Sequence, residues 1–421
     1  MHLTTVLCNV NHAEVVIIAG RFVNGVGERM KVMGEAYIVA VARSAGGKRN
    51  GRLAGVHPVD LAGKVIAGLI ERAGIDPAAV EDVIMGCACP GAEQGANIGR
   101  YAALAAGLPE NVPGTTVDRQ CGSSQQAIHF AAATVMAGVM DVVVAAGVES
   151  MTRVPMGLPW TLPAQHGYGT YRSPAIEALY PTPFSQFGGA EKIAAKYGLA
   201  KDRLDAFALE SHRRAAAATE MGKFEAEIVP IEVTLPDGTT DIHRIDEGIR
   251  FDATLEKIAN VKLLQEGGVI TAANASQICD GAAAVLIVNE RGLRSLGLSP
   301  MARIHDMTVI GHDPVIMLEA PIPATEKALK KSGLTLSDID LFEVNEAFAS
   351  VPLAWLDAMD ADMGRMNVNG GAIALGHPLG GSGTKLMTTL IHALHDRGAR
   401  YGLQTMCEAG GMANVTIVER L

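Results

Sequence analysis

Short apolar runs rich in β-branched residues alternate with longer, alanine-rich amphipathic stretches along most of the chain. The first cycle runs from AYIVAVA at 36–42 through a helical pattern at 61–74 to VEDVIMG at 80–86. Such alternation is typical of βαβ units and of a sheet covered by helices. The strand-like run in DVVVAAGVES at 141–150 is apolar, as burial on both faces requires. The sequence therefore predicts an α/β fold.

The same rhythm returns in the C-terminal part of the chain, which indicates a duplication. Its last two strand-like segments, 401–411 and 413–420, flank a Gly-Gly turn, much as the first part closes with a strand and a loop. We place the first half at residues 35–296 and the second at 297–421. The duplication is visible in the layout, not in residue identity.

Two segments depart from this rhythm. Residues 153–186 contain many prolines and glycines, so we expect regular structure to fail there. Helical patterns and a polar, strand-like stretch follow, and we interpret 153–275 as an insertion that carries substrate-facing loops. Residues 1–34 lack a clear period, and we predict that they are an extension outside the fold.

Composition excludes several classes of protein. The 421 residues carry a formal net charge of −10, which disfavours a nucleic-acid backbone as partner, and 48% of them are apolar, too many for a disordered chain. The apolar patch at 15–19 is too short to cross a membrane. Six cysteines are spread thinly over the chain, typical of reduced thiols. Cys87 and Cys89 lack a second ligand pair at zinc spacing, so we expect no metal. We also expect a cytoplasmic protein.

Cys121 is the first candidate for chemistry. It lies between a strand-like TTV and a long alanine-rich stretch, 125–138, which predicts a thiol at the start of a buried helix. Backbone NH groups and the helix dipole favour a thiolate there, so we expect a lowered pKa and a nucleophile. The alternative is a buried structural cysteine.

Three further segments carry polar or thiol side chains at bends. His377 lies in NVNGGAIALGHPLGGSGTK, 367–385, where little side-chain bulk separates the backbone from a ligand. Asn345 follows the strand-like LFEV, at the strand end where α/β active sites form. Cys407 ends an apolar strand before a glycine bend. A generic glycine turn with an incidental histidine is the alternative for the first segment.

Together these segments resemble the thiolase family over nearly the whole chain from about residue 35. The resemblance rests on Cys121-Gly122-Ser123, the NEAF block at 345–348, the GHP block at 376–378 and Cys407. It implies a duplicated fold of two βαβαβαββ-type halves in a layered α-β-α-β-α core with an inserted loop domain. It also implies acyl transfer with coenzyme A as co-substrate and no permanently bound cofactor.

The resemblance also implies a role for each site residue. Cys121 would attack the keto carbonyl of a 3-oxoacyl-CoA, His377 would take its proton, and Cys407 would protonate the departing acetyl-CoA carbanion. Asn345, through a water, would stabilise the oxyanion together with His377. Residues expected to contact coenzyme A or substrate are Ser276, Arg250, Ala347 and Phe348, and the backbone oxyanion hole involves Cys121 and Ala409.

Two positions differ from the family pattern. Ser124 replaces the usual Gly after CxS, and Ala409 replaces the first Gly of CxGGG. Neither change removes a reacting side chain. Ala409 would be strained if the bend required a left-handed backbone at that residue.

The sequence leaves alternatives for the direction of the reaction and for its substrate. A degradative 3-ketoacyl-CoA thiolase of β-oxidation is our prediction, because SQFGGAEKIA at 185–194 lacks the methionine and histidine typical of short-chain biosynthetic members. Acetoacetyl-CoA formation from two acetyl-CoA molecules is the alternative, and a steroid side chain stays open as substrate. A ketoacyl synthase, which pairs its cysteine with two histidines, and a non-catalytic acyl-CoA or lipid carrier are further alternatives. We expect a homodimer or homotetramer that can associate with other β-oxidation enzymes and binds neither nucleic acid nor membrane.

Overall fold

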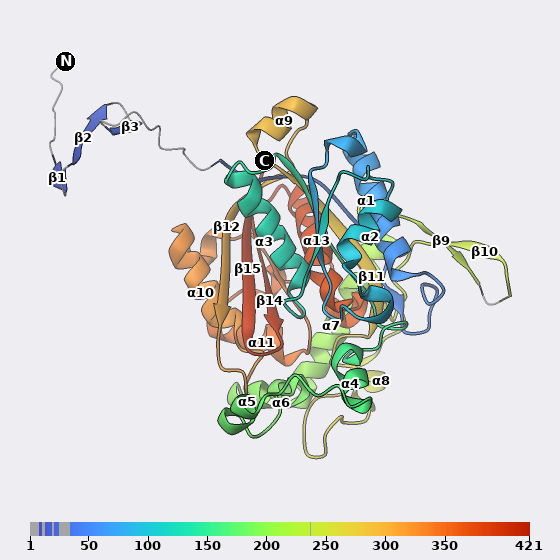
Figure 1. The fold of residues 1–421 in the computed structure, drawn as a ribbon. Helices are drawn as coiled ribbons and strands as arrows, with labels where there is room; N and C mark the ends of the chain where they lie inside the picture. The colour runs from blue at the N-terminus through green and yellow to red at the C-terminus, as the bar shows by residue number, and fades with distance from the viewer. Residues whose placement is uncertain (1–7, 11–12, 19–20, 25–33, 236) are drawn as a thin grey trace.

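The computed structural model describes residues 8–10, 13–18, 21–24, 34–235 and 237–421 (Figure 1). The strands in these residues are β1 (Cys8–Val10), β2 (Ala13–Ile18), β3 (Arg21–Asn24), β4 (Tyr37–Arg43), β5 (Gly47–Lys48), β6 (Asp82–Gly86), β7 (Gly114–Val117), β8 (Val142–Ser150), β9 (Ile231–Thr234), β10 (Thr240–His243), β11 (Cys279–Val288), β12 (Ala302–Gly311), β13 (Leu341–Val344), β14 (Tyr401–Glu408) and β15 (Met412–Arg420). The α-helices are α1 (Pro58–Ala73), α2 (Ile98–Ala105), α3 (Ser123–Met136), α4 (Leu158–Gln165), α5 (Pro174–Leu179), α6 (Gln186–Lys196), α7 (Lys201–Glu220), α8 (Leu255–Ala259), α9 (Glu290–Leu296), α10 (Pro321–Ser332), α11 (Ser350–Met359), α12 (Ala372–Leu375) and α13 (Ser382–Arg397).

One large mixed sheet runs through the molecule in the order β13-β14-β15-β12-β4-β11-β8-β6-β7, with β5 attached to β11. Strands β6, β7 and β8 are parallel, as are β13 and β14, and the other neighbours are antiparallel. The two halves of the sheet meet where Ala302 of β12 pairs with Ile38 of β4. All nine residues of β8 are buried, which confirms a strand covered on both faces.

Helices cover the sheet in three layers. Helices α1 and α2 pack on the first half of the sheet, α10 packs on β12, β14 and β15, and α11 packs against α10. Between them α3 and α13 contact each other and strands of both halves. Figure 1 shows these two helices between α1 on one side and α10 on the other. The duplicated α-β-α-β-α architecture that the family resemblance implies is confirmed.

The two central helices are buried on nearly every face. Helix α13 exposes little besides its last turn, and α3 presents mostly alanine, serine and glutamine to its neighbours. Two helices packed this closely need small residues where their backbones approach each other. A methyl group at Gly383 would overlap the backbone N of Gln125, so this glycine permits the first turns of α13 and α3 to touch. The contact brings the loops that precede the two helices together.

The insertion contains helices where we expected irregular structure. Within 153–186 the chain forms α4 and α5, so that expectation was wrong. The reason lies in where the prolines stand: Pro159 and Pro174 occupy the first turns of these helices, where no backbone NH is needed. Pro163 lies inside α4, which ends two residues later. Helices α6, α7 and α8 and the two-stranded sheet of β9 and β10 complete the insertion.

Removing residues 1–33 is predicted to leave the fold intact. Among the described strands, β1, β2 and β3 pair only with one another, whereas Gly34 N already donates to Met136 O at 3.0 Å. The measurement is the thermal unfolding midpoint and the elution volume of the truncated chain beside the full chain. A fall in Tm of more than about 5 °C would show that the extension packs on the core.

Candidate active site

Cys121 lies in a tight turn between β7 and α3. Gln120 adopts a left-handed conformation with φ of 51°, which is uncommon for a residue with a Cβ. Asp118 Oδ1 accepts the NH of Gln120 at 2.8 Å, and Ser123 Oγ accepts the NH of Arg119 at 2.9 Å. These hydrogen bonds hold the strained turn and present Cys121 at the start of the helix.

The Cys121 thiol is protonated in this site. Burial raises its pKa to about 12, and the neighbouring Glu408 carboxyl contributes to the rise. The expectation of a pKa lowered by the helix start was therefore wrong, because desolvation of the charged form outweighs the backbone NH groups. A nucleophile here needs a base to take its proton.

His377 supplies an imidazole with a defined tautomer. Its Nδ1 lies 2.5 Å from Ser382 Oγ, and that hydroxyl donates its own proton to Pro378 O at 2.9 Å. Nδ1 must then carry the hydrogen, which leaves the lone pair on Nε2. Burial lowers the His377 pKa to about 3, so the ring is neutral and able to accept a proton.

Asn345 lies directly after β13 and faces this imidazole. Its Nδ2 is 3.4 Å from Nε2 of His377. Its Oδ1 is buried and has no hydrogen-bond partner in the described part of the chain. A buried amide with a spare acceptor is costly unless a ligand completes it, so this side chain is available for polar contact in the site.

Cys407, the penultimate residue of β14, is the second buried thiol. Burial raises its pKa well above the usual value, and Cys121 and Glu408 are the next contributors, which places both thiols in one electrostatic environment. The chain then reverses at Gly410 and Gly411, with φ of 85° and 76°. The left-handed conformations thus fall on two glycines, so Ala409 carries no such strain.

A buried carboxylate holds the histidine loop in place. Glu149 Oε2 accepts the NH groups of Ala88 and Gly380, both at 2.8 Å, and so ties the segment of Cys87 and Cys89 to the loop after His377. The cysteine pair is buried in this contact.

In the described residues no three His, Cys, Asp or Glu side chains gather as a metal site, and no helix is long and apolar enough to cross a membrane.

A cavity of about 470 Å³ opens beside His377. It is also lined by the other residues that the sequence analysis assigns to coenzyme A or substrate, Ser276, Arg250, Ala347 and Phe348. Ser276 N donates to Ala347 O at 2.9 Å, which joins two of these segments. The apolar lining residues include Met151, Met156, Phe187, Leu264, Ile278 and Leu379.

Sequence reasoning missed four residues of this region. Lys48 and Arg49 line the cavity, and a basic pair directly after Gly46-Gly47 could have indicated an anion-binding loop. Ser382 and Glu408 act through tertiary contacts that no local pattern reveals.

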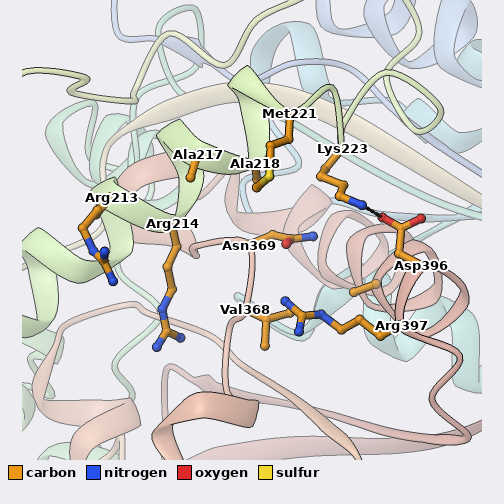
Figure 2. A pocket seen from close by; sticks show the side chains of 11 residues that line it. Arg213, Arg214, Ala217, Ala218, Met221, Lys223, Val368, Asn369, Asp396 and Arg397 are labelled. Atoms are coloured by element: carbon orange, nitrogen blue, oxygen red, sulfur yellow. Dashed lines mark ion pairs between the residues drawn. The ribbon is translucent and has the colours of Figure 1, made fainter.

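A second cavity, of about 230 Å³, contains none of the predicted site residues. Figure 2 shows it between α7 and the end of α13, with Arg397 beside Val368. Its cations are largely neutralised: Lys223 pairs with Asp396 at 3.0 Å, and Glu210 binds both Arg213 and Arg214. We therefore place the chemistry at the cavity beside His377.

Comparison with known proteins agrees with this geometry. The family model "Thiolase, N-terminal domain" matches residues 36–291, and "Thiolase, C-terminal domain" matches residues 298–420. The steroid 3-ketoacyl-CoA thiolase FadA6 of Mycobacterium tuberculosis is 51% identical over 93% of this chain and 96% of its own length. The acetyl-CoA acetyltransferase of Chromobacterium violaceum is 40% identical over 92% of this chain and all of its own.

Solved structures show the same architecture. The Bacillus anthracis acetyl-CoA acetyltransferase superposes with a TM-score of 0.85 at 37% identity, and human mitochondrial 3-ketoacyl-CoA thiolase with 0.83 at 33% identity. Each comparison covers 93% of this chain and all of the other.

Proposed function

Because the chain belongs to the thiolase family, we propose that it cleaves 3-oxoacyl-CoA with coenzyme A through an acyl-enzyme on Cys121. The observations that carry these residue roles are the electrostatic coupling of a buried helix-start thiol with a buried strand-end thiol, and a neutral, buried imidazole in the loop whose Leu379 packs in one cluster with Cys121. The products are acetyl-CoA and an acyl-CoA shortened by two carbons.

The first step is attack on the keto carbonyl. His377 Nε2 takes the Cys121 proton, and the sulfur forms a bond to the carbonyl carbon. The new oxyanion is stabilised by NH donors. In this proposal these donors are the backbone NH of Cys121 at the helix start, the protonated His377 and the Asn345 amide. Ser382 supports this step because it keeps the lone pair on Nε2.

The second step breaks the carbon–carbon bond. The electron pair passes to the α-carbon of the leaving acetyl-CoA, and the Cys407 thiol gives that carbon a proton. A thiol whose pKa is raised by burial is fully protonated and ready to act as this acid. The resulting Cys407 thiolate then takes the proton from the thiol of free coenzyme A, whose sulfur attacks the acyl-enzyme. Cys121 leaves as a thiolate and recovers its proton from His377.

The cavity suits an acyl-CoA. Lys48, Arg49 and Arg250 place three cations on its lining, although the chain as a whole has a net charge of −10. Coenzyme A carries phosphate groups, which such cations attract. The backbone Ala409 NH after Cys407 supplies a second oxyanion donor in this proposal, and Ser276, Ala347 and Phe348 line the path of the thioester arm.

We assign the degradative direction, as an acetyl-CoA C-acyltransferase of β-oxidation. The support is the apolar side of the cavity, which accommodates an acyl chain longer than acetyl, and the relative named as a steroid thiolase. Condensation of two acetyl-CoA molecules is the second candidate, favoured by the relatives named acetyl-CoA acetyltransferase.

The proposal also includes self-association of this chain. Strand β7 closes one edge of the sheet with partly exposed residues, and such an edge can pair with another strand. We propose a homodimer or homotetramer in the cytoplasm that can work beside other β-oxidation enzymes.

A chain-length series tests the direction. For thiolysis of 3-oxoacyl-CoA substrates, kcat/KM is predicted to rise by at least about tenfold from the four-carbon to the longer or polycyclic acyl groups, because each buried CH₂ contributes about 0.8 kcal/mol. The measurement is steady-state kinetics with each substrate below its KM. A maximum at acetoacetyl-CoA would support the condensing enzyme instead.

Cys407→Ser is predicted to separate the two chemical steps. A hydroxyl is a much weaker acid and base than a thiol, so thiolysis should fall by at least about 100-fold, while acylation of Cys121 by acetyl-CoA should change far less. Burst acylation and full thiolysis are measured side by side. Cys87→Ser, at another buried thiol, is the control, and an equal loss in both steps of the Cys407 variant would indicate a structural role.

A further inference from the structure

Glu408 places a buried carboxyl group against the nucleophile turn. It follows Cys407 on β14, so the two side chains point to opposite faces of the strand. A methyl group at Gly122 would overlap Glu408 Oε1, which puts this carboxyl directly beside the residue that follows Cys121. The Glu408 residue has no exposed surface, and both of its carboxyl oxygens lack a hydrogen-bond partner in the described residues. The thiolase steps above make no use of it.

The second side chain that faces Gly122, Asn414, presents an acceptor oxygen to the same space as the Glu408 carboxyl. Asn414 Oδ1 lies 3.0 Å from the same methyl position at Gly122 and also has no partner. Its Nδ2 is already directed to Gln126 Oε1 at 3.3 Å and His129 Nδ1 at 3.4 Å. If Glu408 were ionised, its carboxylate and Asn414 Oδ1 would both be hydrogen-bond acceptors, and neither could donate to the other. A protonated carboxyl can donate a hydrogen bond to this oxygen, whereas a carboxylate cannot.

We propose that Glu408 is a positioning residue whose protonation state controls the reactivity of Cys121. As a neutral acid it can donate to Asn414 Oδ1 and leaves the helix start free to stabilise a thiolate. As a carboxylate it sets a negative charge beside the same backbone and opposes thiolate formation. The inference rests on the proposed function only in that Cys121 is the nucleophile.

The charged and titratable groups around Glu408 are few. Arg119, in the loop before α3, is the cation that lowers its pKa, and Cys121 and Cys407 are the thiols whose pKa values it raises. His129 of α3, which reaches Asn414, is neutral because burial lowers its pKa to about 3. Burial dominates and raises the Glu408 pKa to about 8. The change of state therefore falls just above neutral pH.

Alkylation of Cys121 by iodoacetamide tests the inference without any acyl-CoA substrate. The rate is followed on the Cys121 peptide by mass spectrometry on either side of pH 8, in wild type and Glu408→Gln. In wild type the alkylation rate should rise with pH and then flatten above pH 8, where Glu408 ionises. In Glu408→Gln the rate should continue to rise and should exceed the wild-type rate by about tenfold, which corresponds to a change of one unit in the thiol pKa. Gln keeps the shape and can still donate to Asn414.

Glu343→Gln is the matched control. Glu343 on β13 is likewise buried and has a carboxyl oxygen that lacks a hydrogen-bond partner in the described residues. It is not among the groups that shift the pKa of Cys121. Its variant should reproduce the wild-type alkylation profile. Superimposable profiles for Glu408→Gln and wild type would overturn the inference, and they would leave the assignment of Cys121 as nucleophile untouched.

A stability measurement gives a second readout. The folded pKa of Glu408 lies above its ordinary value of 4.5, so between that value and about 8 the folded chain holds a proton that the unfolded chain has released. Wild type should therefore lose unfolding free energy relative to Glu408→Gln as pH rises through this window. A difference that stays constant with pH would contradict a neutral Glu408.

Discussion

The contact between the first turns of α3 and α13 brings together the loops that carry Cys121 and His377. Gly383 carries no side chain that would push the backbone of Gln125 away, and Gly147 of β8 similarly admits the loop at Gly380. Both helices are covered by strands of the two sheet halves, so neither can shift without disturbing the core. Cys121 precedes one helix and His377 the other, so this packing sets the two loops side by side, with Cys121 and Leu379 in one buried cluster.

Buried charges secure the loop that carries the histidine. Arg43 of β4 pairs with Glu227 at 2.6 Å and with Asp246 at 2.9 Å, and all three side chains are inaccessible to solvent. Lys385 of α13 lies 3.7 Å from Asp246 and donates to the carbonyls of Leu375 and Gly376, just before His377. Charges at this depth are tolerated only when each has a partner, so the network joins the insertion, the sheet and α13 into one unit. The cost of burial recurs in the site itself, where it raises both thiol pKa values and keeps the imidazole neutral.

Local pattern predicted the elements but not the environment of their side chains. The runs of β4, β6 and β8 and the helix after Cys121 follow from period and composition, since each pattern is contained in a few neighbouring residues. The prolines of 153–186 led to the wrong expectation of irregular structure. A proline in the first turn of a helix cannot be told from one that prevents a helix by the sequence alone. The Cys121 pKa is raised first by burial in the folded core and then by Glu408, nearly three hundred residues away, and the tautomer of His377 depends on the geometry of Ser382. Such effects arise from tertiary packing and desolvation, which a linear pattern does not contain.

The division of labour between the two thiols is tested most directly by locating the covalent intermediate. Wild-type protein is mixed with acetyl-CoA without a second substrate, quenched in acid, digested and examined by peptide mass spectrometry. We predict one acetyl group per chain, on the peptide that contains Cys121, because this thiol alone stands at a helix start beside the imidazole loop. An acetyl group on the Cys407 peptide, with Cys121 unmodified, would contradict the assignment.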